Sequence, residues 1–400
     1  MHIVIIWQRF LPYHVARLAR LARRLAESGP CLTAVEVASS DDSYAFPGAF
    51  PKENGFEHVC CFPGSSYHAH TSDGIFKAVS AILENIRPDI VFAPATPFPE
   101  GMAAVTYRCR SATRVVMMDD AWEHTDRSGL LTRFIKRQIH RNIDVAFIPA
   151  SSHREYYRNM GFPEDRIVCG VDVVDNEYFS SAADAARNKG KELRSELSLC
   201  KNYFLFVGRF LERKGIEDLI DSYIAYKTAA EDPWDLVCVG AGPDMDAIRK
   251  RAADIAGIQV VGPKYGDSLC LYYAFASVLL VPSRSDPWGL VVNEGMACGL
   301  PVIVSKGCGG AKTLVLEGEN GWTYEPGDTS ALTVLMQRAN KLPPGSLRRM
   351  GDRSRAIVSE WSLDRFVEGV LAAVKLSRRS AAGVIADFFV KLWKGHVIIT

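Results

Sequence analysis

Short apolar runs alternate with longer segments of helical periodicity from one end of the chain to the other. A continuous apolar run of about four to eight residues is typical of a strand buried on both faces, and a helix between two such runs makes the strands parallel. The first half therefore predicts a parallel α/β sheet. Its expected strands are Ile3–Ile6, Leu32–Val37, Ile90–Ala93, Val115–Met118, Val145–Ile148 and Ile167–Gly170, and its expected helices are His14–Glu27, Ile75–Ile86, Leu130–Asn142 and His153–Met160.

The same alternation restarts in the second half. Two such series predict two Rossmann-like, doubly wound parallel sheets facing a cleft, and ligands of such sheets bind outside the carboxyl ends of the strands. We expect a first domain over residues 1–178 and a second over 179–364, with the helices of 365–400 packing back on the first. By composition the polar segment 180–201 is the best boundary candidate; the alternative is a surface helix of the second domain. The expected strands are Tyr203–Val207, Leu236–Val239, Ile258–Val261, Val278–Val281 and Pro301–Val304.

Composition excludes several classes of protein. The 400 residues carry a net charge of +1 without a basic domain, so nothing points to nucleic acid. The 10 cysteines lack C-x-x-C spacing, and several lie in apolar runs, which favours free thiols in a reducing compartment over disulfides or zinc. Residues 1–6 form an expected core strand without the basic leader of a signal peptide, and no apolar run approaches the ~20 residues of a membrane span. We expect a cytoplasmic protein.

The segment 282–301 holds the strongest candidate chemistry. It follows an expected strand and contains a polar turn and then a short helical run. A helix N-terminus offers free backbone N–H groups and the positive end of the helix dipole, so the amides of Gly289 and Leu290 can hold a phosphate. Asp286 precedes the turn and Glu294 lies about one turn inside the helix, where each can accept hydrogen bonds from sugar hydroxyls. Taken alone, this spacing of two acids favours solvated carboxylates beside an ordinary turn.

A second string, Val207–Gly215, follows the first strand of the second half. Gly208 allows a tight turn at the strand end. Arg209 and Lys214 would flank one wall of a crevice, where the guanidinium fork and the ammonium point charge both suit diphosphate oxygens. Two ordinary surface cations are the alternative, and for an isolated pair that alternative is preferred.

The two strings resemble signatures of the retaining family-four glycosyltransferases, E-P-F-G-x-x-x-x-E-A-M-A-C-G-x-P-V-I and V-G-R-x-x-x-x-K-G. The chain departs from the first signature at Asp286 for Glu, Trp288 for Phe and Gly295 for Ala. Three weaker matches follow the family order: an interdomain passage at 170–179, a G-x-G-P turn at 240–243 and glycine-rich elements at 307–310 and 317–322. The resemblance covers about residues 170–365 well and the first half loosely.

The resemblance implies a GT-B fold with an acceptor domain followed by a nucleotide-sugar donor domain. It implies no cofactor beyond the substrate, a UDP- or GDP-linked sugar, and no metal. Asp244-Met245-Asp246 is formally a D-x-D, but it falls in the first turn of an expected helix, where we interpret the acids as capping. The implied roles are donor diphosphate binding for Arg209, Lys214, Gly289 and Leu290, ribose binding for Glu294 and sugar binding for Asp286.

Candidate residues of the first half are less well defined. Asp119 and Asp120 end an expected strand where many relatives place a His-Asp pair, and His124 follows. Contact with the sugar or the acceptor and capping of a following helix are about equally well supported. Tyr13 and His14 belong to a plausible acceptor loop, Gln8–His14, although His14 is equally well explained as a simple surface residue.

Two segments raise the question of a membrane. Arg17, Arg20, Arg23 and Arg24 line one side of an expected helix beside leucines, which favours an ordinary amphipathic surface helix over docking on anionic lipid. The aromatic-rich tail, Val384–Lys394, either packs across the first domain or touches a membrane. The sequence leaves peripheral membrane contact, and the oligomeric state, open.

We therefore expect a metal-independent hexosyltransferase that retains configuration, with a glycan, a glycolipid or a small molecule as acceptor. Polysaccharide or glycolipid assembly is the expectation at the level of the family. A nucleotide-sugar epimerase or phosphorylase of the same fold is one alternative, and a catalytically silent sugar-nucleotide binding protein is another. A nicotinamide dehydrogenase is disfavoured because the turn after the first strand, 7–12, has no glycine fingerprint.

Overall fold

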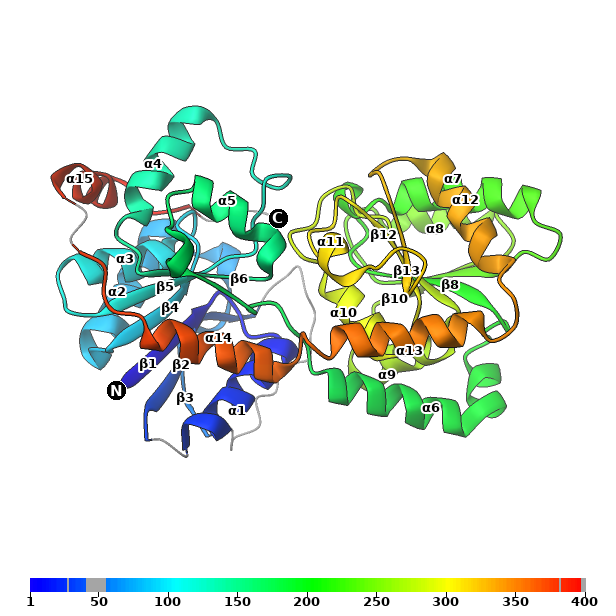
Figure 1. Cartoon of the computed structure of the whole chain (residues 1–400), viewed down its shortest axis with the longest axis horizontal. Coiled ribbons are helices and arrows are strands. Elements are labelled where there is room, and N and C mark those ends of the chain that lie inside the picture. Colours follow the sequence, from blue (N-terminus) through cyan, green and yellow to red (C-terminus); the bar gives the residue numbers. More distant parts are fainter. Residues whose placement is uncertain (27–28, 41–54, 381–382, 397–400) are drawn as a thin grey trace. The chain divides into compact units, whose positions relative to one another are not determined.

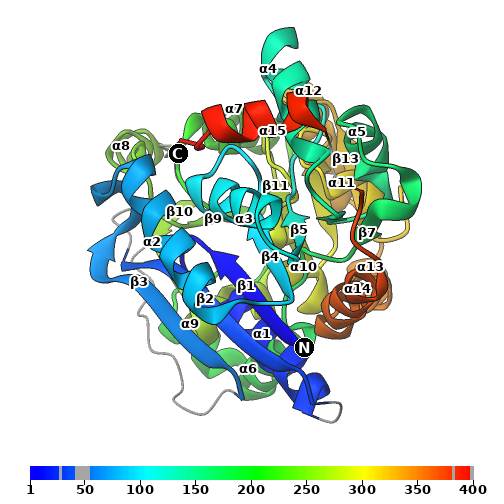
Figure 2. The ribbon, with the colours of Figure 1, turned by 90° about the vertical axis from the view of Figure 1, so that its left-hand side faces the viewer.

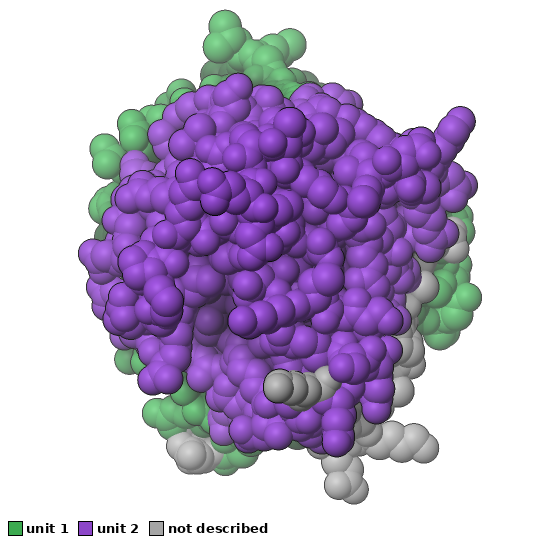
Figure 3. Space-filling view, turned by 90° about the vertical axis from the view of Figure 1, so that its right-hand side faces the viewer, with its two compact units in different colours: residues 1–173, 363–400 green, residues 174–362 purple. Residues whose placement is uncertain are grey.

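The computed structural model describes residues 1–26, 29–40, 55–380 and 383–396 (Figure 1). They form two compact units, coloured separately in Figure 3. Unit 1 comprises Met1–Val173 and Leu363–Thr400, and unit 2 comprises Val174–Ser362. We expected the two boundaries between the domains a few residues later, after 178 and after 364.

The interpretation of segment 180–201 as the boundary is wrong. Most of it belongs to helix α6 (Asn176–Glu196), whose N-cap residue Asp175 accepts a hydrogen bond from the Tyr178 amide at 3.0 Å. This helix packs against α9 (Gly266–Phe275) inside unit 2. A polar, solvent-facing helix has the same composition as a linker, so only its packing distinguishes the two.

Unit 1 is built on a seven-stranded parallel sheet with the order β3-β2-β1-β4-β5-β6-β7. All six predicted strands of this half are present. Strand β3 was not predicted, because it is an edge strand whose residues are half-buried or exposed and therefore form no continuous apolar run. The strands are β1 His2–Trp7, β2 Cys31–Ser40, β3 Glu57–Ser66, β4 Ile90–Pro94, β5 Arg114–Met118, β6 Val145–Ile148 and β7 Ile167–Cys169.

Helices cover both faces of this sheet. Helices α2 and α3 lie side by side on one face (Figure 2), and α1 and α14 pack together on the other. Helix α3 was not predicted: nine of its eleven residues are buried, so the segment shows no polar stripe. The predicted end of the first helix, Glu27, lies outside the described residues. The helices are α1 Pro12–Ala26, α2 Ser72–Ile86, α3 Pro99–Cys109, α4 Leu130–His140, α5 Arg154–Asn159, α14 Leu363–Lys375 and α15 Val384–Leu392.

Two arginines of α1 make hydrogen bonds and an ion pair inside unit 1. Arg17 is 1% exposed, and its guanidinium donates to the Val173 carbonyl at 2.7 and 2.9 Å. Arg20 makes a two-pronged ion pair with Asp364 of α14, both contacts at 2.7 Å. The prediction of a basic, solvent-facing side is therefore wrong for Arg17, whereas the Arg20 side chain stays 43% exposed beside its partner on α14.

Unit 2 contains a six-stranded parallel sheet with the order β10-β9-β8-β11-β12-β13. The five predicted strands are present, and the short edge strand β13 was missed. Helices α7, α8 and α12 share one core with the sheet, while α6, α9, α10 and α13 pack with one another. The remaining bounds are β8 Tyr203–Val207, β9 Asp235–Val239, β10 Ile258–Gly262, β11 Val278–Val281, β12 Val302–Ser305, β13 Gly321–Tyr324, α7 Ile216–Ala229, α8 Met245–Ala253, α10 Leu290–Ala297, α11 Ala311–Leu314, α12 Thr329–Asn340 and α13 Ser346–Val358.

Candidate functional site

The predicted donor residues gather at the carboxyl edge of the unit 2 sheet. Strands β8, β11 and β12 are neighbours, so the loops that follow them meet at this edge. The Arg284 amide donates to the Arg213 carbonyl at 2.9 Å, which joins the loops after β8 and β11. The Asp286 amide donates to the Gly307 carbonyl at 2.9 Å, which joins the loops after β11 and β12. Backbone hydrogen bonds therefore fix the three loops as one surface.

Lys214 and Asp286 form a direct ion pair. The Lys214 Nζ lies 2.5 Å from Asp286 Oδ2, and the two side chains are 19% and 7% exposed. Ser283 Oγ lies 3.4 Å from the same oxygen. The sequence placed these residues at different parts of a donor, one at the phosphates and the other at the sugar. The structure brings them together, so a bound donor would meet a paired cation and anion.

The start of α10 depends on Gly289. This residue is the N-cap of the helix, with φ of +87°, and no side chain caps the first turn. A Cβ at Gly289 would lie 2.5 Å from Cys308 Sγ, so both the backbone conformation and the space require glycine. Gly289 has no side chain to cap the first N–H groups of α10, and the amino end of a helix favours an anion.

Trp288, one of the departures from the family signature, is a core residue. It is 1% exposed, and its indole N–H donates to Asn293 Oδ1 at 3.0 Å. The larger ring therefore brings a polar group that Asn293, one turn along the chain, satisfies. This substitution therefore lies in the support of the α10 N-terminus.

Glu294 lies one turn inside α10, as predicted. Its Oε2 accepts a hydrogen bond from the hydroxyl of Tyr273, on α9, at 2.7 Å. Burial raises the pKa of Glu294 to about 7, and the Tyr273 hydrogen bond opposes that rise only in part. The carboxyl group is therefore poised between its neutral and charged forms near neutral pH.

The remaining donor elements have structural roles as well. Arg209 is half-buried directly after β8. A side chain at Gly240, in the G-x-G-P turn, would collide with the Gly208 carbonyl, so this turn gives the loop after β8 room for close backbone contact. Asp244 is the N-cap residue of α8 and Asp246 lies in its first turn, so the predicted placement of these acids at a helix start is confirmed, although the Asp244 side chain makes no capping hydrogen bond.

Sequence reasoning missed Arg284. Its guanidinium makes two hydrogen bonds of 2.7 Å to the Asp218 carboxylate, which ties the loop carrying Asp286 to α7. Arg284 lies only two residues before Asp286 in the quoted signature, yet its partner is 66 residues away. A side chain whose partner is this distant gives no local signal.

In unit 1, Asp119 and Asp120 follow β5 at the carboxyl edge of the sheet. The Ala121 amide donates to Asp119 Oδ1 at 3.3 Å, and burial raises the pKa of Asp119. Helix α4 begins only at Leu130, so the interpretation of these acids as helix caps is wrong. His124, further along the same loop, has its ring 5.4 Å from the ring of Trp122.

Tyr13 and His14 lie in the first turn of α1, so the predicted helix at His14 is confirmed, while the predicted acceptor loop ends before Tyr13. The His14 ring stacks on Trp7 at 4.5 Å, and the Leu11 amide donates to its Nδ1 at 3.1 Å. Burial, and secondarily the charge of Arg17, hold the pKa of His14 well below its usual value. A surface role for His14 is therefore excluded, and its neutral ring carries the proton on Nε2.

Arg17 draws the predicted residues of this edge together. Its guanidinium lies 5.0 Å from the centre of the Tyr13 ring. Burial lowers the pKa of Arg17, while the nearby charges of Asp172 and Asp120 oppose that change. Tyr13, His14 and Asp120 are therefore neighbours of one buried cation, a grouping that no sequence pattern predicted.

Glu100 is a second residue that sequence reasoning missed. It lies in the first turn of α3, fully buried, and accepts a hydrogen bond from the Tyr67 hydroxyl at 3.0 Å. Burial raises its pKa to about 7. Since α3 itself was not predicted, nothing in the sequence marked this carboxyl group.

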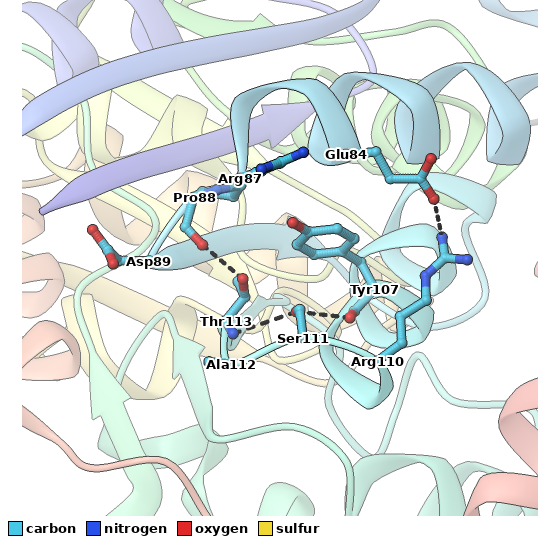
Figure 4. A pocket seen from close by; sticks show the side chains of 9 residues that line it. All are labelled: Glu84, Arg87, Pro88, Asp89, Tyr107, Arg110, Ser111, Ala112 and Thr113. Carbon is cyan, nitrogen blue, oxygen red and sulfur yellow. Dashed lines mark hydrogen bonds and ion pairs between the residues drawn. The ribbon is translucent and has the colours of Figure 1, made fainter.

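A pocket of about 580 Å³ lies at the opposite edge of the unit 1 sheet (Figure 4). Asp89 and Thr113, which line it, precede β4 and β5, so this is the amino edge of the sheet. An ion pair of 2.7 Å between Glu84 and Arg110 crosses its rim. The predicted site residues of unit 1 lie in loops that follow the strands, at the carboxyl edge of the sheet. This pocket is therefore separate from those residues.

Comparison with known proteins tests the family. The pattern of the family described as glycosyl transferases group 1 matches residues 191–356, which contain both quoted signatures. This part of the chain is similar to the group 1 glycosyltransferases. The predicted family is therefore confirmed.

Curated relatives agree with this similarity. A protein of Methanocaldococcus jannaschii named as an uncharacterized glycosyltransferase is 26% identical over 224 residues, which are 54% of this chain and 61% of that protein. D-inositol 3-phosphate glycosyltransferase of Acidothermus cellulolyticus is 32% identical over 199 residues, 44% of this chain and 42% of the relative. The chain thus spans about half the length of the curated relatives it matches.

Solved structures match nearly the whole chain. Sucrose-phosphate synthase of Thermosynechococcus elongatus has a TM-score of 0.73 at 19% identity, with 94% of this chain and 98% of that chain covered. Anabaena HepE, solved in complex with UDP and glucose, has a TM-score of 0.72 at 15% identity, with 94% and 99% covered. At such identities the likeness establishes the fold, and the predicted GT-B architecture is confirmed.

Proposed function

We propose that the chain transfers a hexose from a nucleoside diphosphate sugar to a glycan, glycolipid or small-molecule acceptor, with retention of configuration and without a metal ion. The observation that carries this proposal is the cluster at the carboxyl edge of the unit 2 sheet, where Lys214 contacts Asp286 beside the uncapped start of α10. Relatives named for transfer to inositol phosphate, and a structural neighbour solved with UDP and glucose, support the same substrate class.

In this proposal the donor diphosphate is held by positive groups alone. Negative charge develops on the diphosphate as its bond to the sugar breaks, and the cations Lys214 and Arg209 would stabilise it together with the amides of Gly289 and Leu290. Groups fixed in advance where charge develops usually supply the largest catalytic contribution. When the donor binds, the Lys214 ammonium would also contact the phosphate, and its ion pair with Asp286 would weaken. Asp286 could then accept a hydrogen bond from a sugar hydroxyl.

Glu294 would bind the ribose diol. A carboxylate accepts two hydroxyl hydrogen bonds only when ionised, and its pKa of about 7 means that donor binding would draw it to the charged form. The acceptor would bind at the carboxyl edge of unit 1, near Tyr13, His14 and Asp120. As the family resemblance implies, the leaving phosphate would take the acceptor proton.

The test is donor binding and slow donor hydrolysis in the presence of EDTA. Purified protein is incubated with UDP- and GDP-linked sugars, and thermal stabilisation and released nucleotide are measured for wild type, Glu294→Ala and Glu360→Ala. Glu360 is an exposed acid of unit 2 and serves as the matched control. We expect one donor to stabilise both the wild type and the control and to be hydrolysed slowly by both. The Glu294→Ala variant should show neither the stabilisation nor the hydrolysis.

Other outcomes distinguish the alternatives. A requirement for a divalent ion contradicts the proposed mechanism. An isomerised nucleotide sugar indicates an epimerase, and stabilisation without turnover, even with acceptors added, indicates a binding protein. If no nucleotide sugar raises the melting temperature, the proposed substrate class is wrong.

A further inference from the structure

Exposed apolar side chains are concentrated on two short helices of unit 1. Of the twelve large apolar side chains exposed in the described part of the chain, seven lie on α4 and α15. Large exposed apolar patches usually mark a surface that another body covers. We name this patch the α4–α15 surface and define it by Leu130, Leu131, Phe134, Ile385, Phe388 and Leu392, each between 49% and 88% exposed.

The two helices form one continuous surface. They pack against each other (Figure 1), and the rings of Phe134 and Phe389 lie 6.0 Å apart, edge to face. Ala386 and Val390 fill the opposite, buried side of α15. Helix α15 is therefore apolar both toward the protein and away from it, a pattern that in a stable helix calls for cover on both sides.

The apolar patch continues into a cationic one. Leu130, Phe134, Arg137 and Arg141 follow one another at helical spacing along one face of α4, which contains no acidic residue. A depression of about 500 Å³ is lined by Phe134, Arg137, Arg141 and Arg379. The whole chain has a net charge of only +1, so this is a local concentration of positive charge.

Acids are few around this surface. Asp126 is paired within unit 1, 3.3 Å from Arg133 and 3.6 Å from Lys136. Asp387, on α15, accepts a hydrogen bond from the Asn142 side chain at 3.2 Å, and the exposed Glu123 lines a depression beside Leu130, Phe134 and Arg137. The surface keeps a positive balance, because its cations outnumber Glu123 and Asp387: Arg137, Arg141, Arg379 and Lys391.

We propose that the α4–α15 surface docks on an anionic lipid bilayer. Its leucines, isoleucine and phenylalanines enter the boundary of the acyl chains, while Arg137, Arg141 and Arg379 face lipid phosphates. This is the arrangement of a helix that lies in the plane of the interface, with apolar burial and attraction to anionic headgroups acting together. In the described residues no helix is long and apolar enough to cross a bilayer, so the contact is peripheral.

This surface differs from the one that the arginines of α1 suggested. It is also attached to the proposed acceptor edge: Trp393 Nε1 donates to the Thr96 carbonyl at 2.9 Å, and the His396 amide donates to the Pro97 carbonyl at 2.7 Å. Both acceptors belong to the loop that follows β4. Docking would therefore bring that edge close to the bilayer, although the docking itself does not depend on the proposed activity.

The test is flotation of the whole chain with vesicles of phosphatidylcholine, alone or with about one third phosphatidylglycerol. We expect binding to the anionic vesicles only, and loss of binding at about 0.5 M NaCl, where the screening length falls to a few ångströms. Phe134→Ser/Phe388→Ser and Arg137→Glu/Arg141→Glu should each weaken binding about a hundred-fold. The matched controls in unit 2, Ile224→Ser/Val334→Ser and Arg348→Glu/Arg349→Glu, should bind like wild type.

Hydrogen exchange of the wild type with and without anionic vesicles tests the location without any variant. We expect protection over 130–141 and 384–392. The proposal is overturned if the wild type stays unbound with anionic vesicles, if the controls lose as much binding as the test variants, or if protection appears elsewhere. It is also overturned if the wild type forms a dimer without vesicles that Phe134→Ser/Phe388→Ser dissociates, because the patch is then an interface between copies.

Discussion

Removing the Lys214 ammonium should destabilise unit 2 by about 2–3 kcal/mol at neutral pH. Breaking a buried ion pair by removing one partner costs about 3–5 kcal/mol, because a charge is left without compensation. Asp286 is 7% exposed, so water can replace the lost ammonium only in part, and Ser283 Oγ lies 3.4 Å from the paired oxygen. The Lys214 side chain is 19% exposed, so water can partly take the place of the lost ammonium. We therefore expect a cost below the about 3–5 kcal/mol of a fully buried pair.

Lys214→Met is the sharpest single variant, since methionine keeps most of the apolar stem. The second variant is Asp286→Asn, and the third combines both changes. We expect the double variant to recover most of the stability lost by Lys214→Met, since two neutral side chains of similar volume need no counter-charge.

The assay is urea unfolding followed by circular dichroism, with nucleotide-sugar binding measured in parallel. The double variant should be stable and yet bind no donor, which separates the support given by the pair from its proposed role in binding. The reasoning is refuted if Lys214→Met costs less than about 0.5 kcal/mol, the size of an exposed ion pair. It is refuted equally if the double variant loses the sum of the two single costs.

Three further outcomes follow from the same region. Gly289→Ala should cost about 1–3 kcal/mol in thermal unfolding, and more than Gly345→Ala, which has a similar positive φ but no atom closer than 3.5 Å to the added carbon. Because the pKa of Glu294 is raised to about 7, its stabilising contribution is complete below about pH 4.5 and is lost as the pH rises through 7. Wild type should therefore lose up to about 3 kcal/mol over this range relative to Glu294→Gln, measured by urea unfolding at each pH. Trp288→Phe should cost about 1–3 kcal/mol, since Asn293 Oδ1 would remain buried without its donor, and Trp288→Phe/Asn293→Leu should recover part of that loss.

The sequence by itself determined the two parallel sheets and the family. Buried strands such as Val145–Ile148 and Val278–Val281 are apolar on both faces, so their pattern is local and can be read without a partner. The signature around Asp286 and Glu294 is equally local. The edge strand β3 and the buried helix α3 escaped prediction because one is too polar for a continuous apolar run and the other too uniformly buried for a stripe.

Only the tertiary structure decided which side chains meet. Lys214 and Asp286 are 72 residues apart, and Arg20 and Asp364 are 344 apart, so no spacing in the sequence predicts either pair. The same holds for the stacking of His14 on Trp7, which decided between the two sequence-based alternatives for His14 by making its ring half-buried and neutral. Hydrophobic periodicity reports the environment averaged along one element, whereas ion pairs, stacked rings and uncovered apolar faces depend on which elements the fold brings together.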